Sequence, residues 1–565
     1  MSEELKNINV ENLSEQLKTN QISRREFVRN AALLGVAVPA AYALASKITG
    51  VPFIEEAQAS NHLPQGGTFR LGTHVKDISN PHTMSWGGYD SNMTRHVVEY
   101  LTWTDDKGIT HPYLLEKFSP SADLKTWTLT LRKNVKWSDG STLTADQVIW
   151  NLKRVLTPAV GSSMLGLMKD YMLVEFETGE KDKDGKAVKD MKLWSNNAIE
   201  KKGDFTIVLN CKSATLAVPE HLFHYPMAIL HPQDNGKFGL GSRGTGPYTM
   251  TAFELNKQAS FKKRADYWDK ANQPALDTLE FIDTGDDPNA ANNLLISGQI
   301  DGLVTTDPGQ YDALSSQKSL QLYSVSTAQT GVMRMNVTNK PFDNPKVRKA
   351  MRLAIDNEKV LKIALKDLGT VGGHHHVSPA HPDYAPLPKF RQDIAQAKKL
   401  LAEAGFPNGF STEIYVPNDY AWFLTQAEVA VQMWKEIGVT VKINNIPAAN
   451  YWDVWTKVPL GVTIWLPRPL GFMVLALAYK TGVPWNESAY SNSEFDKILT
   501  TAEGTADLAK RKALMEKLET ILQEDGPLVQ PVFVNSFTFM NKKVKGFTMH
   551  PATYFFGWKI GVAKA

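Results

Sequence analysis

The stretch "LKTWTLTLRKNVKWSDGSTLTADQVIWNLKRVL" (residues 124–156) joins a strand pattern directly to a helix pattern. In its first part, Trp127, Leu129 and Leu131 alternate with Thr128 and Thr130. An apolar/polar alternation with a period of two is typical of a strand that buries one face. We therefore expect a half-buried strand within residues 124–137.

A helix is expected to follow this strand after a turn. Asp139-Gly140 is a turn dipeptide, because glycine adopts the backbone angles that tight turns need. Thr144 is the expected helix N-cap, and Gln147, three residues later, fits the capping-box pattern. The stretch thus predicts a strand–turn–helix unit.

The remainder of the chain predicts a mixed α/β protein. From about residue 340, helix and strand patterns alternate, which is typical of an α/β lobe. The expected elements there are a helix pair over 343–365, a helix over 393–406 closed by Gly405, and strands over 412–416 and 439–446 on either side of a helix over 424–436. Earlier, residues 66–72 predict a short strand and residues 179–190 a charged hairpin or loop insertion.

Composition limits the classes of function. A chain of 565 residues is too long for one hydrophobic core and predicts two or three domains. The net charge is +3 and no long basic stripe is present, so we expect no nucleic-acid partner. The one cysteine, Cys211, rules out an intramolecular disulfide, a cysteine zinc site and a redox pair. We expect Cys211 to be a small, partly buried strand residue.

The first 59 residues have the features of an export signal. A twin-arginine pattern, Ser23–Val28, precedes an uncharged run over 31–46 that is short for a membrane span and contains Pro39. Small-residue cleavage sites follow at Ala43–Ala45 and Ala57–Ala59. The alternative is an amphipathic or anchoring helix. We expect the mature protein to begin near Ser60 and to work in the periplasm, where chemistry driven by ATP or NAD is not expected.

Five stretches carry a resemblance to one known family. They are "PYLLEKFSPSADLKTWTLTLRKNVKWSDGSTLTADQVIWNLKRVL" (112–156), "GTGPYTMTAFELNKQASFKKRADYW" (244–268), "LISGQIDGL" (295–303), "MNVTNKPFDNPKVRKAMRLAIDNEKVL" (335–361) and "AYSNSEFDKILTTA" (489–502). In this order they resemble the landmarks of the extracytoplasmic solute-binding proteins of ABC importers, in the peptide/nickel/opine-binding family (solute-binding protein family 5).

The resemblance implies an α/β clamp of two lobes. The first lobe would comprise residues 60–325 and 530–565, with an extra subdomain near 105–220, and the second would comprise 330–525. Hinge crossings are expected near 326–332 and 527–534. The lobes would close over a ligand by hinge motion. The closed form would then be recognised by a membrane permease, with no enzymatic activity, no cofactor and a monomeric receptor.

One arginine in "TIWLPRPLGFM" (463–473) is the leading candidate for a ligand anchor. Peptide-binding members that resemble this chain have a Trp-x-x-Asp pattern here, whereas this chain keeps Trp465 and has Arg468 at about the place of the acid. The family's other anchor, an arginine, corresponds to the region of Asp419. We therefore expect Arg468 to hold an acidic ligand group and Asp419 a cationic one. The alternative is an internal ion pair of Arg468 with Glu487 or Asp453.

Aromatic residues are the expected walls of the same site, because they combine a large apolar face with a polar tip. The candidates from the second lobe are Trp465, Tyr420, Trp422 and Trp485, with Asn486 adding hydrogen bonds. Trp86 and Tyr89 in "SWGGYD" (85–90) are candidates from the first lobe, where core packing is the equal alternative.

Two other motifs carry weaker hypotheses. "GSRGTGPY" (241–248) lacks the lysine and helix of a phosphate loop and is expected to be a structural turn. "GGHHHVSPAH" (372–381) places His374, His375, His376 and His381 in what we expect to be an exposed loop. One or two of these histidines could instead bind a metal.

The sequence therefore predicts a periplasmic receptor for short peptides. A receptor for an acidic or zwitterionic opine-like solute, or for a metal chelate, is the alternative within the class. From other classes, an extracytoplasmic hydrolase and a chaperone-like protein stay open. The hydrolase lacks a sequence signature, because Gly-x-Ser-x-Gly and His-Glu-x-x-His are both absent.

Overall fold

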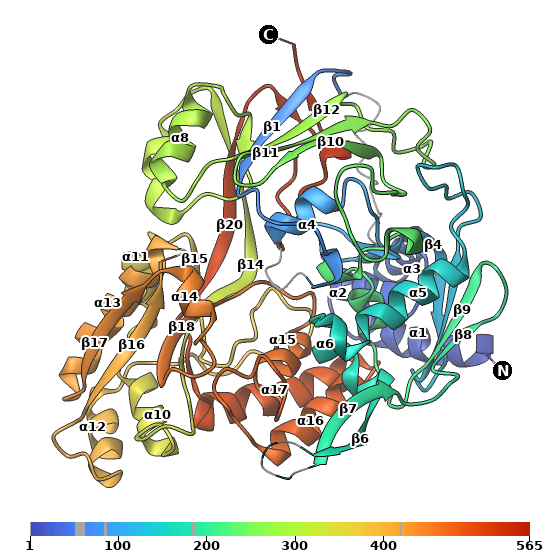
Figure 1. Ribbon diagram of the computed structural model, residues 1–565. Coiled ribbons are helices and arrows are strands. Elements are labelled where there is room, and N and C mark those ends of the chain that lie inside the picture. The colour runs from blue at the N-terminus through green and yellow to red at the C-terminus, as the bar shows by residue number, and fades with distance from the viewer. Residues whose placement is uncertain are drawn as a thin grey trace.

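The computed structural model describes residues 2–50, 63–83, 88–181, 183, 185, 187–418 and 420–564, and its largest sheet has 12 strands. Two lobes share this sheet (Figure 1). In sheet order the strands are β10 (Tyr248–Glu254), β11 (Gln258–Lys263), β12 (Thr278–Asp283), β1 (Thr68–Thr73), β13 (Gly302–Leu303), β20 (Val532–Asn541), β14 (Leu320–Met335), β18 (Leu460–Trp465), β16 (Ser411–Pro417) and β17 (Thr440–Ile446), while β15 (Gly369–Val371) pairs with β20 and β19 (Leu528–Val529) pairs with β14.

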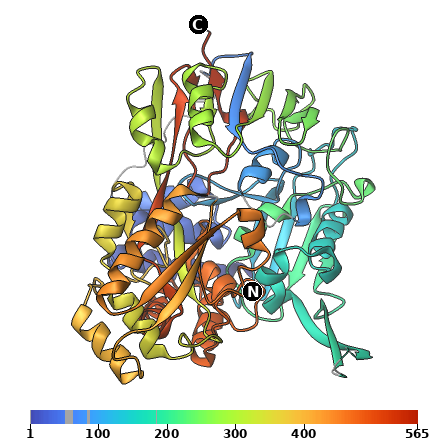
Figure 2. The same ribbon diagram turned by 60° about the vertical axis from the view of Figure 1, so that its left-hand side comes forward.

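The long strand β14 passes from one lobe to the other (Figures 1 and 2). Its first part, residues 320–325, pairs with β20, and its last part, residues 330–335, pairs with β18. Between Val325 and Gln329 the register shifts. The sheet is therefore divided at this point into a first lobe around β1 and a second lobe around β16 and β18. The shift overlaps the range 326–332 expected for the first hinge crossing, which stays a prediction.

The opening stretch folds as the sequence predicts. The strand is β5 (Thr126–Leu131), with Trp127, Leu129 and Leu131 fully buried. It lies in a four-stranded sheet ordered β4 (Leu115–Pro120), β5, β9 (Thr206–Asn210) and β8 (Ile199–Lys201). The helix is α5 (Ala145–Val155), where the Thr144 backbone N–H donates to Gln147 Oε1 at 2.9 Å.

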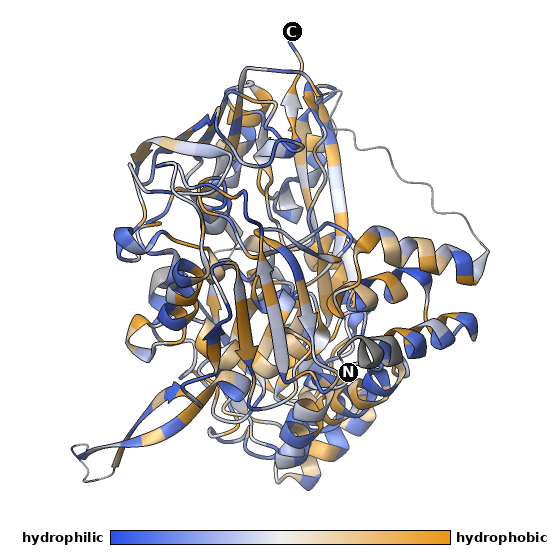
Figure 3. Ribbon diagram, turned by 90° about the vertical axis from the view of Figure 1, so that its right-hand side faces the viewer, coloured by the Kyte–Doolittle hydropathy of each residue, from blue (hydrophilic) through white to orange (hydrophobic). Residues whose placement is uncertain are grey.

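The charged segment at residues 179–190, expected to be either a hairpin or a loop insertion, is a hairpin. It consists of β6 (Leu173–Lys181) and β7 (Ala187–Leu193), which pair antiparallel. Figures 2 and 3 show this hairpin projecting from the body of the protein. Most of its residues are exposed, which agrees with its charged composition.

The second lobe confirms the expected alternation of helices and strands. Strands β16 and β17 pair in parallel, joined by the helix α13 (Ala421–Glu436). The other long helices of this half are α10 (Pro345–Leu353), α11 (Asn357–Leu365), α12 (Ile394–Glu403), α15 (Gly471–Ala478), α16 (Ser493–Glu503) and α17 (Leu508–Asp525). One apolar cluster fills the lobe between β16, β18 and α10 to α13. A second cluster runs from the first lobe into α15, α16 and α17.

Shorter elements complete the body and cover the first lobe. They are α4 (Gly88–Thr94), α6 (Met164–Met172), α7 (Val218–His221), α8 (Pro288–Ile296), α9 (Tyr311–Ser315), α14 (Ala448–Trp452), β2 (Thr102–Thr104), β3 (Thr110–Pro112), β21 (Val544–Lys545) and β22 (Gly561–Val562).

Three helices precede the body: α1 (Ser2–Lys18), α2 (Arg24–Leu33) and α3 (Val38–Thr49). They pack against it, and the apolar cluster of the first lobe includes residues from all three (Figure 3). The expected cleavage site at 57–59 lies outside the described residues. Among the helices of the described chain, none is both long and apolar enough to cross a membrane.

The glycines of residues 241–248 confirm a structural turn. A Cβ atom on Gly244 would come within 1.9 Å of the Val97 carbonyl oxygen, and one on Gly246 within 2.6 Å of the His96 carbonyl oxygen. Any side chain here would displace the backbone, so these glycines allow two chain segments to touch.

The expectation for Cys211 is corrected in two respects. The residue lies directly after β9 rather than within it, and it is fully buried rather than partly so. Burial raises the pKa of its thiol to about 12. The thiol is therefore neutral and serves as a small apolar group.

Candidate ligand-binding site

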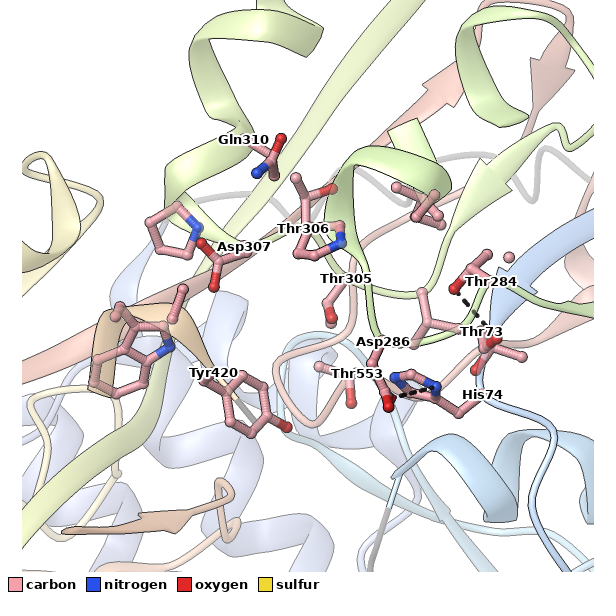
Figure 4. Close-up of a pocket in the computed structure, with 18 of the residues that line it drawn as sticks. Thr73, His74, Thr284, Asp286, Thr305, Thr306, Asp307, Gln310, Tyr420 and Thr553 are labelled. Carbon is pink, nitrogen blue, oxygen red and sulfur yellow. Dashed lines mark hydrogen bonds and ion pairs between the residues drawn. The ribbon is translucent and has the colours of Figure 1, made fainter. Parts of the chain in front are cut away.

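A cavity of about 570 Å³ lies between the two lobes (Figure 4). The first lobe contributes Thr73, His74, Lys76, Thr284, Asp286, Asp287, Thr305, Thr306, Asp307, Gln310, Ser536 and Thr553. The second lobe contributes Asn418, Tyr420, Ala421, Trp422, Pro447, Ala448 and Leu466. Both lobes therefore contact anything held in the cavity.

The first-lobe wall is polar and rich in hydroxyl groups. Figure 4 shows His74 beside Asp286, with His74 Nδ1 lying 3.9 Å from Asp286 Oδ1. Next to them the Thr284 hydroxyl donates to the Thr73 carbonyl oxygen at 3.5 Å. Lys76 adds a cation to the same wall. A wall of this kind suits a ligand with several hydrogen-bonding groups.

Asp307 extends from the first lobe toward the second. Its Oδ1 accepts the backbone N–H of Gly309 at 2.7 Å. Burial raises the pKa of Asp307, against the opposing effect of hydrogen bonds from the N–H groups of Gly309 and Ala421. Ala421 is the first residue of α13, and a helix N-terminus favours a nearby negative charge. Asp307 therefore links the lobes at the cavity.

Two of the predicted aromatic residues line the cavity. Figure 4 shows the Tyr420 ring reaching into the space between the lobes. Trp422 is buried beside β14, where a Cβ atom on Gly331 would lie 2.8 Å from its Cη2. The indole therefore packs directly beside the shift in the register of β14.

Three predicted site residues cannot be placed in the cavity. Trp86 and Asp419 lie outside the described residues. Tyr89 belongs to α4, of which only the backbone is described at this position. Their roles stay predictions.

Arg468 is buried at the junction of the lobes, with 7% of its surface exposed. Its Nη1 donates to the carbonyl oxygens of Leu466 at 3.0 Å and Pro467 at 3.2 Å. Within the described part of the chain, Nε has no hydrogen-bond partner and no carboxylate lies within ion-pair distance of the guanidinium. Leu466, two residues earlier, lines the cavity.

The alternative of an ion pair between Arg468 and Glu487 or Asp453 is wrong, because another arginine occupies Glu487. Arg334 Nε lies 3.0 Å from Glu487 Oε2, and both side chains are buried. Thr463 Oγ1 donates to the same oxygen at 2.6 Å, while Trp465 Nε1 donates to Oε1 at 2.9 Å.

This network also fixes the remaining predicted residues behind the cavity. Trp465 is held by Glu487, and the Trp485 ring packs edge-on against it at 6.0 Å. Asn486 uses its amide within its own loop, donating to the carbonyl oxygens of Lys480 at 3.1 Å and Tyr490 at 2.7 Å. The described residues that line the cavity do not include Trp465, Trp485, Asn486 or Arg468.

The surroundings of Arg468 are buried and uncharged. Burial lowers the pKa of His224, from the first lobe, and of His376, from the second, and the charge of Arg468 lowers both further. Burial raises the pKa of Tyr225 to about 12. The guanidinium therefore lies among neutral side chains of both lobes, with the Tyr225 hydroxyl as a hydrogen-bonding neighbour and no carboxylate partner among the described residues.

The histidine loop is buried, which corrects the expectation of an exposed loop. His374 Nδ1 accepts the N–H of Gln530 at 2.9 Å, and His376 Nδ1 lies 2.7 Å from the Tyr479 hydroxyl. Each ring therefore serves a separate packing contact. In the described residues no three His, Cys, Asp or Glu side chains are grouped so as to hold a metal ion.

Comparison with known proteins gives the family. Residues 110–517 match the family described as bacterial extracellular solute-binding proteins, family 5. The chain belongs to this family. The match covers the first-lobe subdomain, most of the second lobe and those residues of the cavity wall that lie between 284 and 466.

Individual proteins resemble the chain in sequence or in structure. The chain is 27% identical to the dipeptide-binding protein DppE of Bacillus subtilis over 486 residues, covering 81% of this chain and 85% of that one. The structure resembles DppA of Helicobacter pylori in complex with the peptide STSA, with a TM-score of 0.76, 20% identity and coverage of 89% and 99%. It also resembles AgaA of A. tumefaciens R10 in complex with agropinic acid, with a TM-score of 0.75, 21% identity and coverage of 88% and 99%.

Sequence reasoning missed the first-lobe wall. Asp307 precedes Pro308 and caps a short helical turn, a pattern that also occurs at ordinary helix starts. Thr73 ends the short strand β1 and His74 follows it, with no distinguishing motif. The pairing of β1 with β13 brings these first-lobe residues together, and the approach of the second lobe closes the cavity over them.

Proposed function

We propose that this protein is the substrate-binding receptor of an ABC importer. It captures a short peptide or a related small solute between its lobes outside the cytoplasmic membrane and delivers it to a membrane permease. The observation that carries this proposal is the cavity of about 570 Å³ lined by both lobes. The relatives named above support it, because they include a dipeptide-binding protein and a protein in complex with a peptide.

The cavity suits a small solute rather than a long chain. Its volume lies within the range of roughly 300–1,000 Å³ that is typical of small-molecule sites. The polar first-lobe wall and the Tyr420 and Trp422 side of the second lobe then contact opposite faces of the solute. No covalent step is part of the proposal, and the receptor acts as a monomer.

Charge selects the solute in this proposal. Asp307 in the cavity wall, together with Asp419 as the sequence predicts, holds a cationic group such as an amine. Arg468 holds an anionic group, since its buried charge has no carboxylate partner in the described chain. Leu466, two residues before Arg468, lines the cavity, so a rearrangement of this loop as the lobes close on the solute would bring the guanidinium to its anionic group.

A second candidate is a receptor for an acidic or zwitterionic solute of the opine type. The unpaired guanidinium of Arg468 favours it, because arginine binds carboxylates through a bidentate fork. The resemblance to AgaA in complex with agropinic acid agrees with this class.

The test is to purify the mature protein gently from its own periplasm and to identify the bound compound by native mass spectrometry. A mixture of short peptides supports the first candidate. A single acidic or zwitterionic compound supports the second. If the protein arrives empty, it is titrated with a dipeptide library and with acidic amino-acid conjugates. Absence of binding in both sets would contradict the proposed function.

A further inference from the structure

The N-terminal helices fit the body as an interface rather than as a loose extension. Phe27, Val28 and Ala31 on α2 are fully buried and belong to one apolar cluster with the first lobe and α17. Figure 3 shows the three helices lying against the outside of the body. Removal of large apolar side chains from water favours association, so this face favours docking.

Polar contacts tie the helices to α17. Asn12 Nδ2 and Gln16 Nε2 donate to the two carboxylate oxygens of Asp507, at 2.7 and 2.8 Å. Lys512 Nζ lies 2.5 Å from Glu26 Oε1. Asp507 caps α17 and Lys512 lies in its first turns, so the contacts concentrate at one end of this helix.

Other contacts tie the same helices to the first-lobe subdomain. Arg29 Nε donates to the Lys107 carbonyl oxygen at 2.8 Å, in the turn before β3. A Cβ atom on Gly35 would lie 2.5 Å from the Phe118 carbonyl oxygen in β4, so the backbones touch there. Residues 29–35 therefore lie on the subdomain.

Helix α17 is itself fixed to the second lobe. Arg348 of α10 pairs with Asp525 at 2.5 Å, and Arg352 Nη2 donates to the Glu524 carbonyl oxygen at 2.8 Å. The N-terminal helices thus contact the subdomain of one lobe and a helix anchored in the other.

We propose that residues 2–50 form a strap that docks across the two lobes and holds them together while it is attached to the chain. The holding role rests on the clamp motion of the proposed function, whereas the docking does not. Release of the strap frees the lobes to open. In the docked strap Phe27 is buried and Arg24 of the twin-arginine pattern is half-buried, with its Nη2 donating to Ser46 Oγ of the strap at 3.0 Å.

Docking is tested on the full chain. A protease site replaces part of residues 51–62, and the purified protein is nicked so that all helices are still present. We expect the N-terminal fragment to co-elute with the body in gel filtration. Arg29→Ala should release the fragment at least tenfold faster, whereas Arg25→Ala, at an exposed neighbouring arginine, should not. If the N-terminal fragment of the unsubstituted protein dissociates from the body as fast as the Arg29→Ala fragment does, the docking is overturned.

Holding is tested by spin-label distances between Lys257→Cys in the first lobe and Lys399→Cys in the second, both exposed positions. We expect a narrow distance distribution with the strap docked and a broader one after the fragment is removed from the nicked protein. An unchanged distribution overturns the holding role. Neither test uses a solute, so failure of the strap and failure of the receptor function are separate results.

Discussion

Two arginines of the second lobe are buried to a similar degree but have opposite surroundings. Arg334 lies against the carboxylate of Glu487, and two further donors saturate that carboxylate. Arg468 lies on the loop after β18, among neutral histidine and tyrosine side chains, with its Nε unpartnered in the described structure.

This difference in surroundings distinguishes an arginine that stabilises the fold from one whose charge is available to a ligand. A buried charge is tolerated when it is paired and hydrogen-bonded, and it is costly otherwise. Glu487 supplies the counter-charge of Arg334 within the chain itself, although Arg334 Nη2 has no hydrogen-bond partner among the described residues, so the pair serves the fold. The charge of Arg468 is a cost to the fold, which a bound anion would offset. The following predictions test this contrast.

The largest expected effect is the loss of stability when the ion pair between Arg334 and Glu487 is broken. Glu487→Gln keeps the shape but leaves Arg334 buried without a counter-charge, so the free energy of unfolding should fall by about 3–5 kcal/mol. Urea denaturation measures this change. Asp453→Asn, at an exposed acid of the same lobe, is the control and should leave stability unchanged. Equal stability of the two variants would show that Arg334 does not depend on its partner.

Substitution of Arg468 should have the opposite result, with little change in stability and a loss of solute affinity. Arg468→Met removes an unpaired charge, so we expect the free energy of unfolding to stay within about 1 kcal/mol of the parent or to increase. Affinity for the co-purified solute should fall about 100-fold in calorimetric titration, because a charge-assisted contact to an anion is lost. Lys389→Met, at an exposed lysine, is the matched control. Unchanged affinity would assign Arg468 to the structure alone.

Glu519 is a third case, a buried acid that stays protonated and therefore neutral in the folded protein. Burial raises the pKa of Glu519 to about 9, and its Oε2 lies 3.5 Å from His375 Nδ1, a ring whose pKa burial lowers to about 3. Between pH 4.5 and 9 the folded protein keeps the Glu519 proton and the unfolded chain releases it. Since the unfolded state binds fewer protons, stability falls as pH rises, by up to about 1.4 kcal/mol per pH unit.

Glu519→Gln should therefore flatten the dependence of stability on pH between 5 and 9, as measured by urea denaturation at several pH values. Glu428→Gln, at an exposed acid of α13, serves as the control. The same slope in the parent and in Glu519→Gln would show that Glu519 is ionised in the folded protein.

The smallest expected effect concerns Trp465. Trp465→Phe removes one hydrogen bond to Glu487 and should lower the free energy of unfolding by about 1 kcal/mol. Solute affinity should change less than twofold, because Trp465 lies behind the cavity wall. A large loss of affinity at unchanged stability would return Trp465 to the ligand contacts that the sequence suggested.

The sequence predicted elements well where one local pattern decides them. Strand β5 follows from its alternation, and α5 follows from Thr144 and Gln147. It also indicated Arg468, because a cation between two prolines in an apolar run needs an explanation. In these cases the decisive contacts are close in the sequence.

What the sequence could not predict depends on distant contacts. Three adjacent histidines are typical of an exposed loop, and only packing against Gln530 and Tyr479 shows that they are buried. Asp307 gains its place from the approach of α13 in the other lobe. The run of small residues after Arg25 suits export and helix packing equally, so it could not reveal the docking of α2.

The strand β14 has a further consequence for how the protein folds. Because β14 pairs with β20 in one lobe and with β18 in the other, and β20 also pairs with β15 of the second lobe, unfolding of either lobe would leave unpaired backbone groups where these shared strands cross the boundary. Loss of one lobe should therefore destabilise the other, so that the two melt as one cooperative unit. The chain segment at which the lobes are expected to rotate is then also the one that makes each lobe depend on the other for its stability.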